Sequence, residues 1–395
     1  MEPQAAPAGR LELADIVRAH ADQLDGLSPE QRRVLQAITH CRTAALGGHR
    51  RQCEACGHEE LSYNSCRNRH CPKCQGLDEA RWIEAQQRDL LPVQYFHLVF
   101  TVPTELHPLF LAAPPVAYRL LFTAAAKTLQ AVARRRLGAT IGFTAVLHTW
   151  TQQLLYHPHI HCIVPGGGLD VDDTRWIPAP RDFFLPVRVL ARVFRGKLLS
   201  LLEKAVNRGK IRAGPDEDFH RQLKQAARKK WVVYSKAPFA GAEQVLAYLG
   251  RYAYRIALSN DRLVALQDGQ VTFRWKDRAH GNAPRLATLD APTFLRRFLL
   301  HVLPRRFVRI RHYGFLANSV RLQQLPRVRQ WLAPSARATE SFAPREPEPW
   351  DALLLRLTGK DVTRCPRCGV GHLVVVEELP ALGQPHPFPR RARSP

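Results

Sequence analysis

The sequence has little negative charge and no long apolar run. Only 34 of its 395 residues are Asp or Glu, against 58 that are Lys or Arg, so the formal net charge is +24. Such an excess favours a polyanionic partner, with nucleic acid ahead of an anionic membrane surface. No apolar run approaches the length of a bilayer span, and the first residues lack the layout of a signal peptide. We therefore expect a cytoplasmic protein without a membrane partner, associated with the nucleoid through DNA.

Cysteines are plentiful for a chain that is expected in the cytosol. Six of the nine lie between Cys41 and Cys74, which indicates metal binding rather than disulfide bonds. Two Cys-x-x-Cys pairs stand 14 residues apart, a spacing typical of tetrahedral zinc sites. Because four thiolates leave no open position for a reaction, we expect this zinc ion to be structural. Its predicted ligands are Cys53, Cys56, Cys71 and Cys74, with Cys66, His58 and His70 as spare candidates.

A further cysteine pair lies near the end of the chain. Cys365 and Cys368 follow a linker rich in Pro, Ala and Glu that begins after Trp331. They have His372 nearby but no second cysteine pair, so as a zinc site they are incomplete. The segment from Pro385 onward is rich in Pro and Arg and is expected to be disordered.

The stretch from His157 to His161 reads His-Pro-His-Ile-His and leads into an apolar segment. In a strand, His159 and His161 lie on one face because side chains alternate. Two imidazoles side by side on an apolar strand make a poor core and a good half of a metal site. An isolated pair of this kind is nevertheless more often structural, so its interpretation as a metal site depends on the other motifs in the chain.

Candidates for a third metal ligand lie on the neighbouring predicted strand. Thr144–Gln153 is predicted to pair with the histidine strand as an antiparallel hairpin. Gln152 and, further along, His148 would then share a sheet face with the two histidines. Gln152 is the first candidate for the third ligand and His148 the second, and the alternative for each is an ordinary strand residue.

A predicted helix from Glu243 to Ala257 carries two tyrosines. Tyr248 and Tyr252 lie one helical turn apart and share a face. Aromatic residues at this spacing usually belong to a core. A glycine and an arginine between the tyrosines are unusual for a core seam, and Arg251 and Arg255 can hold phosphates.

Arginines alternate with aromatic residues in the stretch between Asp290 and Glu340, where no acidic residue occurs. This pattern is typical of single-strand binding, in which cations follow the phosphate backbone and rings stack on bases. A merely solvated basic face is the alternative. The basic loop inside the cysteine region also suits phosphate contact. The arginines expected at DNA are Arg67, Arg69, Arg251, Arg255, Arg305, Arg306, Arg309 and Arg311.

The remaining pattern mixes helices and strands. Ser28 is expected to cap a helix, and Tyr95–Val102 reads as a buried strand. Mostly helical segments follow to about Leu137 and again from Phe184 to Lys230. A short hairpin is predicted around Asp268-Gly269.

Together the motifs resemble those of the two-tyrosine HUH transposases of rolling-circle insertion sequences. The resemblance extends over most of the chain and consists of four blocks in a fixed order. These blocks are Cys41–His49 with the cysteine pairs through Gln75, then His157–His161, then Tyr248–Tyr252, and then His301–Pro304 with Arg309–Gly314.

The resemblance implies an α+β fold. Its centre is an HUH endonuclease domain, a central antiparallel sheet flanked by helices, between a helical zinc-ribbon domain and a basic C-terminal region. We expect the helical and zinc-binding domain at 1–90, the HUH single-strand nuclease and transposase domain at 91–330, and the linker and tail at 331–395.

The resemblance also implies an activity. His159 and His161 correspond to the HUH metal ligands, and Tyr248 and Tyr252 to the paired nucleophiles. The expected reaction is nicking and rejoining of single-stranded DNA with Mg²⁺ or Mn²⁺, through 5′-phosphotyrosine intermediates. The expected partners are the single-stranded ends of the protein's own mobile element and the target DNA. Rival interpretations are a rolling-circle replication initiator and a non-catalytic zinc-ribbon DNA-binding protein.

Overall fold

The structure is a computed structural model that describes residues 10–74, 76–181, 184–212, 216–239, 244–245, 257–277, 280–333 and 348–382. None of the described helices is long and apolar enough to cross a membrane. The chain divides into two compact units, each assembled from separate segments. The first comprises Met1–Arg81, Leu258–Val302 and Arg345–Pro395, and the second Trp82–Ala257 and Leu303–Pro344.

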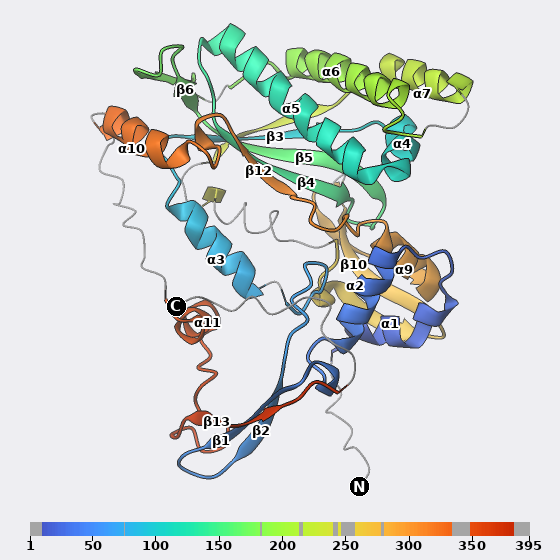
Figure 1. Ribbon diagram of the computed structural model, residues 1–395, viewed down its shortest axis with the longest axis vertical. Helices are drawn as coiled ribbons and strands as arrows, with labels where there is room; N and C mark the ends of the chain where they lie inside the picture. Colours follow the sequence, from blue (N-terminus) through green and yellow to red (C-terminus); the bar gives the residue numbers. More distant parts are fainter. Residues whose placement is uncertain are drawn as a thin grey trace. The chain divides into compact units, whose positions relative to one another are not determined.

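The second unit is built on a five-stranded antiparallel sheet with the order β12-β4-β5-β3-β8 (Figure 1). β4 and β5 form the predicted hairpin, and the predicted buried strand is β3. The inner strands β3 and β5 are buried along almost their whole length, and their aromatic and β-branched residues suit such a buried position. The strands are β3 (Tyr95–Thr101), β4 (Phe143–Trp150), β5 (Tyr156–Pro165), β8 (Val233–Phe239) and β12 (Ile310–Tyr313).

Helices cover one face of this sheet (Figure 1). Phe96, Leu98 and Phe100 alternate along β3 and are buried in the core between the sheet and these helices. Truncating one such phenylalanine to alanine costs about 3–5 kcal/mol, so this layer fixes the sheet firmly. The helical segments are η3 (Thr104–Leu106), α4 (His107–Ala112), α5 (Pro114–Leu137), α6 (Val187–Asn207) and α7 (Asp216–Arg228).

The opposite face of the sheet carries the alternate set of side chains. Tyr95 of β3 and Ile163 of β5 form a small buried cluster there with Val245. Val245 and its neighbour Gln244 are helical. A second small cluster joins α10 to the segment that follows β12, and Arg321 forms an ion pair with Asp89 at 2.7 Å. The remaining elements of this unit are β6 (Gly167–Leu169), β7 (Trp176–Pro178), η6 (Gly314–Leu316) and α10 (Arg321–Leu332).

The first unit begins with two helices. The predicted capping box at Ser28 is confirmed: its Oγ accepts from the Gln31 N–H at 3.2 Å, and its own N–H donates to Gln31 Oε1 at 2.9 Å. This pair satisfies two N–H groups that would otherwise lack partners at the start of the helix. The helical segments are α1 (Leu13–His20), η1 (Ala21–Gln23), α2 (Pro29–His40), η2 (Ala44–Leu46) and α3 (Gly76–Gln87), which crosses into the second unit.

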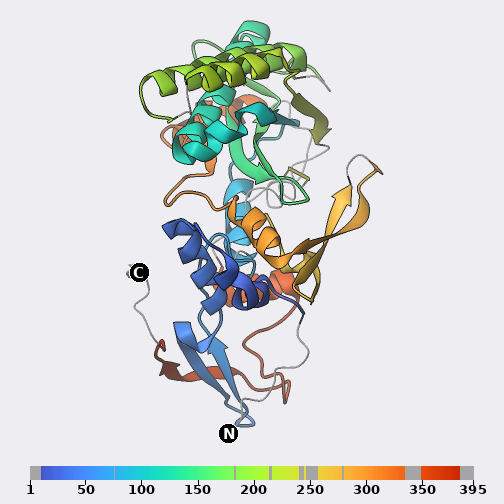
Figure 2. The ribbon, with the colours of Figure 1, turned by 90° about the vertical axis from the view of Figure 1, so that its right-hand side faces the viewer.

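A late segment of the chain packs on these helices. It contains the predicted hairpin around Asp268-Gly269, a third strand and helix α9 (Figure 2). Gln31 of α2 donates to the Leu299 carbonyl at 3.1 Å, and Arg296 of α9 pairs with Asp25 at 2.5 Å. The elements are η4 (Asn260–Arg262), β9 (Leu263–Gln267), β10 (Gln270–Asp277), β11 (Ala283–Asp290) and α9 (Ala291–Leu299).

The first unit ends in a three-stranded antiparallel sheet with the order β13-β1-β2 (Figure 1). Its outer strand β13 comes from the far end of the chain and pairs with β1 from Gly48 opposite Leu379 to Cys53 opposite Leu373. The elements are β1 (Gly48–Cys53), β2 (Glu59–Tyr63), β13 (Leu373–Leu379) and the preceding helix α11 (Trp350–Thr358).

The α+β class is confirmed: antiparallel sheets are flanked by helices, and the metal-binding region is N-terminal. The compact units differ from the contiguous division at 90 and 330, because two later segments return to the first unit. The two later segments join the first unit through strand pairing and helix packing. Changes of composition along the chain do not predict such contacts. The proline- and arginine-rich tail from Pro385 lies outside the described residues.

Candidate metal centres and nuclease site

Three histidines meet on the sheet face opposite the helices. His148 of β4 lies directly across from His159 of β5, and His161 follows on the same face two residues later. One ring nitrogen from each lies within 4.8 Å of the others, and all three side chains are buried. The predicted pairing of His159 with His161 is therefore seen, and β4 supplies a third imidazole.

Hydrogen bonds orient the rings of β5. Nδ1 of His159 lies 2.6 Å from the carbonyl oxygen of His157, to which it donates. The opposite nitrogen, Nε2, then carries the lone pair that a metal requires. The Trp150 ring stacks on His148 with 4.4 Å between centroids, which restricts that imidazole as well.

A fourth histidine, which belongs to none of the sequence motifs, lies beside the group. His97 of β3 lies on the same face, and its Nε2 is 2.8 Å from Nδ1 of His161. The two rings are stacked at 5.1 Å, and His97 is buried. When His161 donates the shared proton, its Nε2 is the nitrogen left for metal binding. The sequence signal that could have identified His97 is its position as a histidine within an otherwise apolar strand.

Gln152, the first candidate for the third ligand, does not lie on the strand. β4 ends at Trp150, and Gln152 is in the turn that leads to β5. The pairing is also irregular between His148 and Trp150, so strict alternation does not extend into the turn. The second candidate, His148, takes the position opposite His159, so the geometry favours His148 over Gln152.

Tyr248, Tyr252, Arg251 and Arg255 lie outside the described residues. The last described residue before them is Val245, which is buried against Ile163 and Tyr95 on the face that carries the histidines.

The arginines near β12 differ in exposure and in position. Arg305 and Arg306 are exposed in the segment before β12, and the Arg309 carbonyl accepts from the Leu147 N–H at 2.9 Å. This segment therefore passes beside the part of β4 that holds His148. Arg311 instead lies over the Phe122 ring, 4.3 Å from its centroid, on the helix-covered side. The structure does not bring Arg311 to the histidine face.

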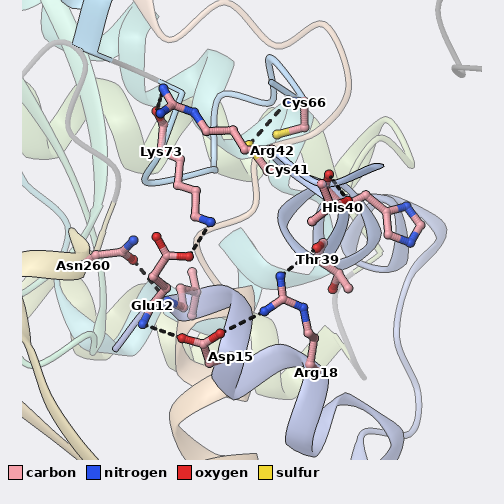
Figure 3. Close-up of polar contacts among 12 residues, drawn as sticks. Glu12, Asp15, Arg18, Thr39, His40, Cys41, Arg42, Cys66, Lys73 and Asn260 are labelled. Atoms are coloured by element: carbon pink, nitrogen blue, oxygen red, sulfur yellow. Dashed lines mark hydrogen bonds and ion pairs between the residues drawn. The ribbon is translucent and has the colours of Figure 1, made fainter. Parts of the chain in front are cut away.

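In the first unit, four cysteine sulfurs form one group at the open end of the β1–β2 hairpin. They belong to Cys41, Cys66, Cys71 and Cys74, and all lie within 4.8 Å of one another. The Sγ atom of Cys74 is 3.2 Å from Cys41 and 3.5 Å from Cys66, and the nearby Cys41 sulfur holds the pKa of the Cys74 thiol well below its ordinary value. Lys73 between the four cysteines pairs with Glu12, the N-cap residue of α1, and Arg42 donates to the Lys73 carbonyl (Figure 3).

The predicted ligand set of Cys53, Cys56, Cys71 and Cys74 is wrong. β1 runs from Gly48 to Cys53, which carries the first pair roughly 17 Å to the far end of the hairpin. Cys53 and Cys56 therefore form a separate group with Cys365 and Cys368, all four sulfurs within 4.8 Å. The C-terminal pair, expected to be incomplete, finds its second pair here. The spare candidates His58 and His70 belong to neither group.

The basic loop between the cysteines is placed beside the first group. Arg67 is exposed and follows Cys66. Arg69 is partly buried, and this burial lowers the pKa of its guanidinium. The ordinary pKa of an arginine is so high that the group is always charged in water. The loop thus presents at least one accessible cation next to the thiolates.

The structure combines an antiparallel α+β unit that holds a buried histidine group with a unit that holds two groups of four cysteines, which are the features of a metal-binding protein. The "Putative transposase" family model matches residues 142–323, and the "Transposase zinc-binding domain" model matches residues 13–102. No solved structure matches the chain.

Two curated relatives extend over nearly the full length. The "Putative transposase y4qJ" of Sinorhizobium fredii is 48% identical over 380 residues, 93% of this chain and 95% of that protein. The "Transposase for insertion sequence element IS801" of Pseudomonas savastanoi pv. phaseolicola is 29% identical over 382 residues, 92% of this chain and 88% of that protein. The chain belongs to the IS91 family of transposases, with a structural zinc-binding domain at its N-terminal end.

Proposed function

We propose that this transposase is an HUH-type nuclease and strand transferase that nicks and rejoins single-stranded DNA during rolling-circle transposition. The observation that carries the proposal is the group of three buried imidazoles from His148, His159 and His161 on one sheet face. One ring nitrogen from each imidazole lies within 4.8 Å of the others, which is the arrangement that a divalent metal site requires.

The donor set fits a divalent cation. Three neutral imidazoles suit a transition metal such as Mn²⁺ at least as well as Mg²⁺, which prefers oxygen ligands. Nδ1 of His159 is already engaged by the His157 carbonyl, so its Nε2 is the donor. A cation held there would polarise the scissile phosphate and stabilise the negative charge that develops on it.

The nucleophiles in this proposal are Tyr248 and Tyr252, which come three and seven residues after Val245. In a helix, positions three and seven residues along share a face with the starting residue. Val245 is buried against the histidine face of the sheet. If the helix predicted from the sequence continues from Val245, both tyrosines would lie on the side of that helix that faces the histidines. Arg251 and Arg255 would then hold phosphates on the flank of the same segment.

The reaction balances without an energy source. The tyrosine oxygen attacks phosphorus and the 3′ oxygen leaves, which gives a 5′-phosphotyrosine and a free 3′ hydroxyl. Attack by a 3′ hydroxyl on the phosphotyrosine reverses the exchange and rejoins a strand. A second tyrosine one turn away can hold a second strand end, as transfer from donor to target requires.

The DNA path in this proposal runs along the segment before β12. Arg305 and Arg306 are exposed there. The same segment reaches β4 at Arg309, whose carbonyl accepts from the N–H of Leu147, the residue before His148. Cations beside a catalytic group follow the phosphate backbone of a single strand. The partners would be the single-stranded ends of the element and the target DNA, which would associate the protein with the nucleoid.

The test is a denaturing gel of purified protein incubated with Mn²⁺ or Mg²⁺ and oligonucleotides from the element's ends. We expect an SDS-resistant protein–DNA adduct that requires the metal and disappears in the double variant Tyr248→Phe/Tyr252→Phe. Tyr254→Phe is the matched control and should retain the adduct. DNA binding without an adduct, on correct end sequences, would instead favour a non-catalytic zinc-ribbon DNA-binding protein.

The same assay decides the third ligand. His148→Ala should abolish the metal-dependent adduct, whereas Gln152→Ala should leave most of it. The reverse result would return the role to the turn residue.

A further inference from the structure

The second cysteine group has the geometry of a metal site in its own right. Sγ of Cys53 is 3.7 Å from Cys368, and Sγ of Cys56 is 3.7 Å from Cys365. Four thiolates around Zn²⁺ at about 2.3 Å lie about 3.8 Å apart, the edge of the tetrahedron. A disulfide needs about 2.05 Å between sulfurs, and all four cysteines are free thiols.

The two cysteine pairs have the same backbone form. In each, the N–H of the glycine after the second cysteine donates to the carbonyl of the first at 3.0 Å, Gly57 to Cys53 and Gly369 to Cys365. Both glycines have left-handed φ values, +68° and +66°, which side chains rarely adopt. Two copies of one tight turn thus aim four sulfurs at a common point.

Hydrogen bonds lock the turns together. The Glu54 N–H donates to the His372 carbonyl at 3.0 Å, and the Gly371 N–H approaches Sγ of Cys368 at 3.4 Å. A Cβ at Gly371 would lie 2.6 Å from Sγ of Cys53, so only glycine fits against that sulfur. Backbone donors directed at sulfur favour the thiolate, the form that binds metal.

This end of the β13–β1–β2 sheet has almost no apolar core. Its buried cluster consists of Cys53, Cys365 and Leu373, with Cys368 packed against it. Val374, Val375 and Val376 of β13 are 38–56% exposed. A ribbon that buries so little apolar surface needs another source of stability, and metal binding supplies it in many small domains.

We propose that Cys53, Cys56, Cys365 and Cys368 bind a second structural zinc ion, distinct from the one at Cys41, Cys66, Cys71 and Cys74. This ion joins segments more than 300 residues apart and holds the C-terminal strand β13 on the N-terminal zinc domain. It makes the C-terminal segment part of that domain rather than a loose tail.

The first measurement is the zinc content of the purified full-length protein, by native mass spectrometry and elemental analysis. We expect two zinc ions per chain, one for each thiolate group. A single zinc ion in the native protein would overturn the proposal without any variant. Because this measurement reports metal content, a single zinc ion would not argue against the proposed nuclease activity. Conversely, a negative result in the nicking assay would not argue against two zinc ions.

Matched double variants assign the ions. Cys365→Ser/Cys368→Ser should lose one zinc ion and gain hydrogen exchange in β1 and β13 only. Cys66→Ser/Cys71→Ser should also lose one ion but leave the β1–β13 amides protected. Retention of two ions by Cys365→Ser/Cys368→Ser would overturn the assignment. If that variant fails to fold, stepwise removal of zinc from the wild type, with exchange followed at β13, gives the same decision.

Discussion

The side chain of His97 acts on the histidine group without belonging to it. It lies on β3, one strand away, and its Nε2 is 2.8 Å from Nδ1 of His161. Groups that hydrogen-bond the outer nitrogen of a ligating histidine fix the tautomer and the orientation of its ring. His97 is thus a positioning residue in the proposed metal site.

Replacing His97 by phenylalanine keeps the buried volume but removes the hydrogen bond. We expect His97→Phe to weaken Mn²⁺ binding about 10- to 100-fold, the usual effect of losing such a partner. His97→Gln, which can still accept from His161, should recover part of the loss. Calorimetric titration of Mn²⁺ into both variants, with thermal unfolding as a control, checks this. Unchanged affinity in a folded His97→Phe protein would remove His97 from the site.

For single residues, the local sequence pattern was enough to predict that His159 and His161 share a face, because this follows from strand alternation alone. It could not rank His148 above Gln152, since that depends on where β4 ends and on the irregular pairing near Trp150. It also could not connect His97 to His161, because they belong to separate strands whose register only the folded sheet sets.

At the level of elements, the edge strand β12 depends on the turn that follows it. Gly314 ends the strand with φ +60°, and a Cβ there would overlap the carbonyl oxygen of Ile141. The obstruction is backbone, which cannot move aside as a flexible side chain can. Gly138, at the end of α5, has a similar φ of +69° but open space around it.

These two glycines provide a matched pair. Gly138→Ala should cost about 1–2 kcal/mol, the strain of a left-handed alanine. Gly314→Ala carries the same strain together with the overlap, so it should be destabilised by more than Gly138→Ala and should loosen β12 from β4. Urea unfolding of both variants measures the difference, and equal losses would show that β12 adapts without cost.

Most individual elements followed from sequence. The capping box at Ser28, the strand at Tyr95 and the hairpin around Asp268-Gly269 all depend on neighbouring residues. The zinc ligand sets did not follow, because spacing along the chain suggested pairing Cys53 with Cys71. The extended β1 separates them, and β13 brings Cys365 and Cys368 to Cys53 instead.

At the level of the whole molecule, the net charge of +24 favours binding to DNA and makes that binding sensitive to salt. If the protein neutralises about six phosphates of a single strand, log K should fall against log salt with a slope of about −4. The double variant Arg305→Gln/Arg306→Gln should make the slope shallower by about 1.4, two contacts' worth.

Fluorescence anisotropy over a salt series gives both slopes. Arg134→Gln/Arg135→Gln removes the same charge from exposed positions on α5, which packs on the face opposite the histidines. This control should change the slope less. Equal changes in the two double variants would mean that overall charge, and not a path beside β12, sets the affinity.

The pairing of Cys53 with Cys368 has a consequence for how the protein is made. The ribosome completes the first cysteine pair more than 300 residues before the second. At about 5–20 residues per second, that interval is about 15 to 60 s. During it, the C-terminal half of the second thiolate group does not yet exist. A transcript cut short before Cys365 would yield chains that can fill the first zinc site but never close the second, so the second zinc ion marks full-length translation.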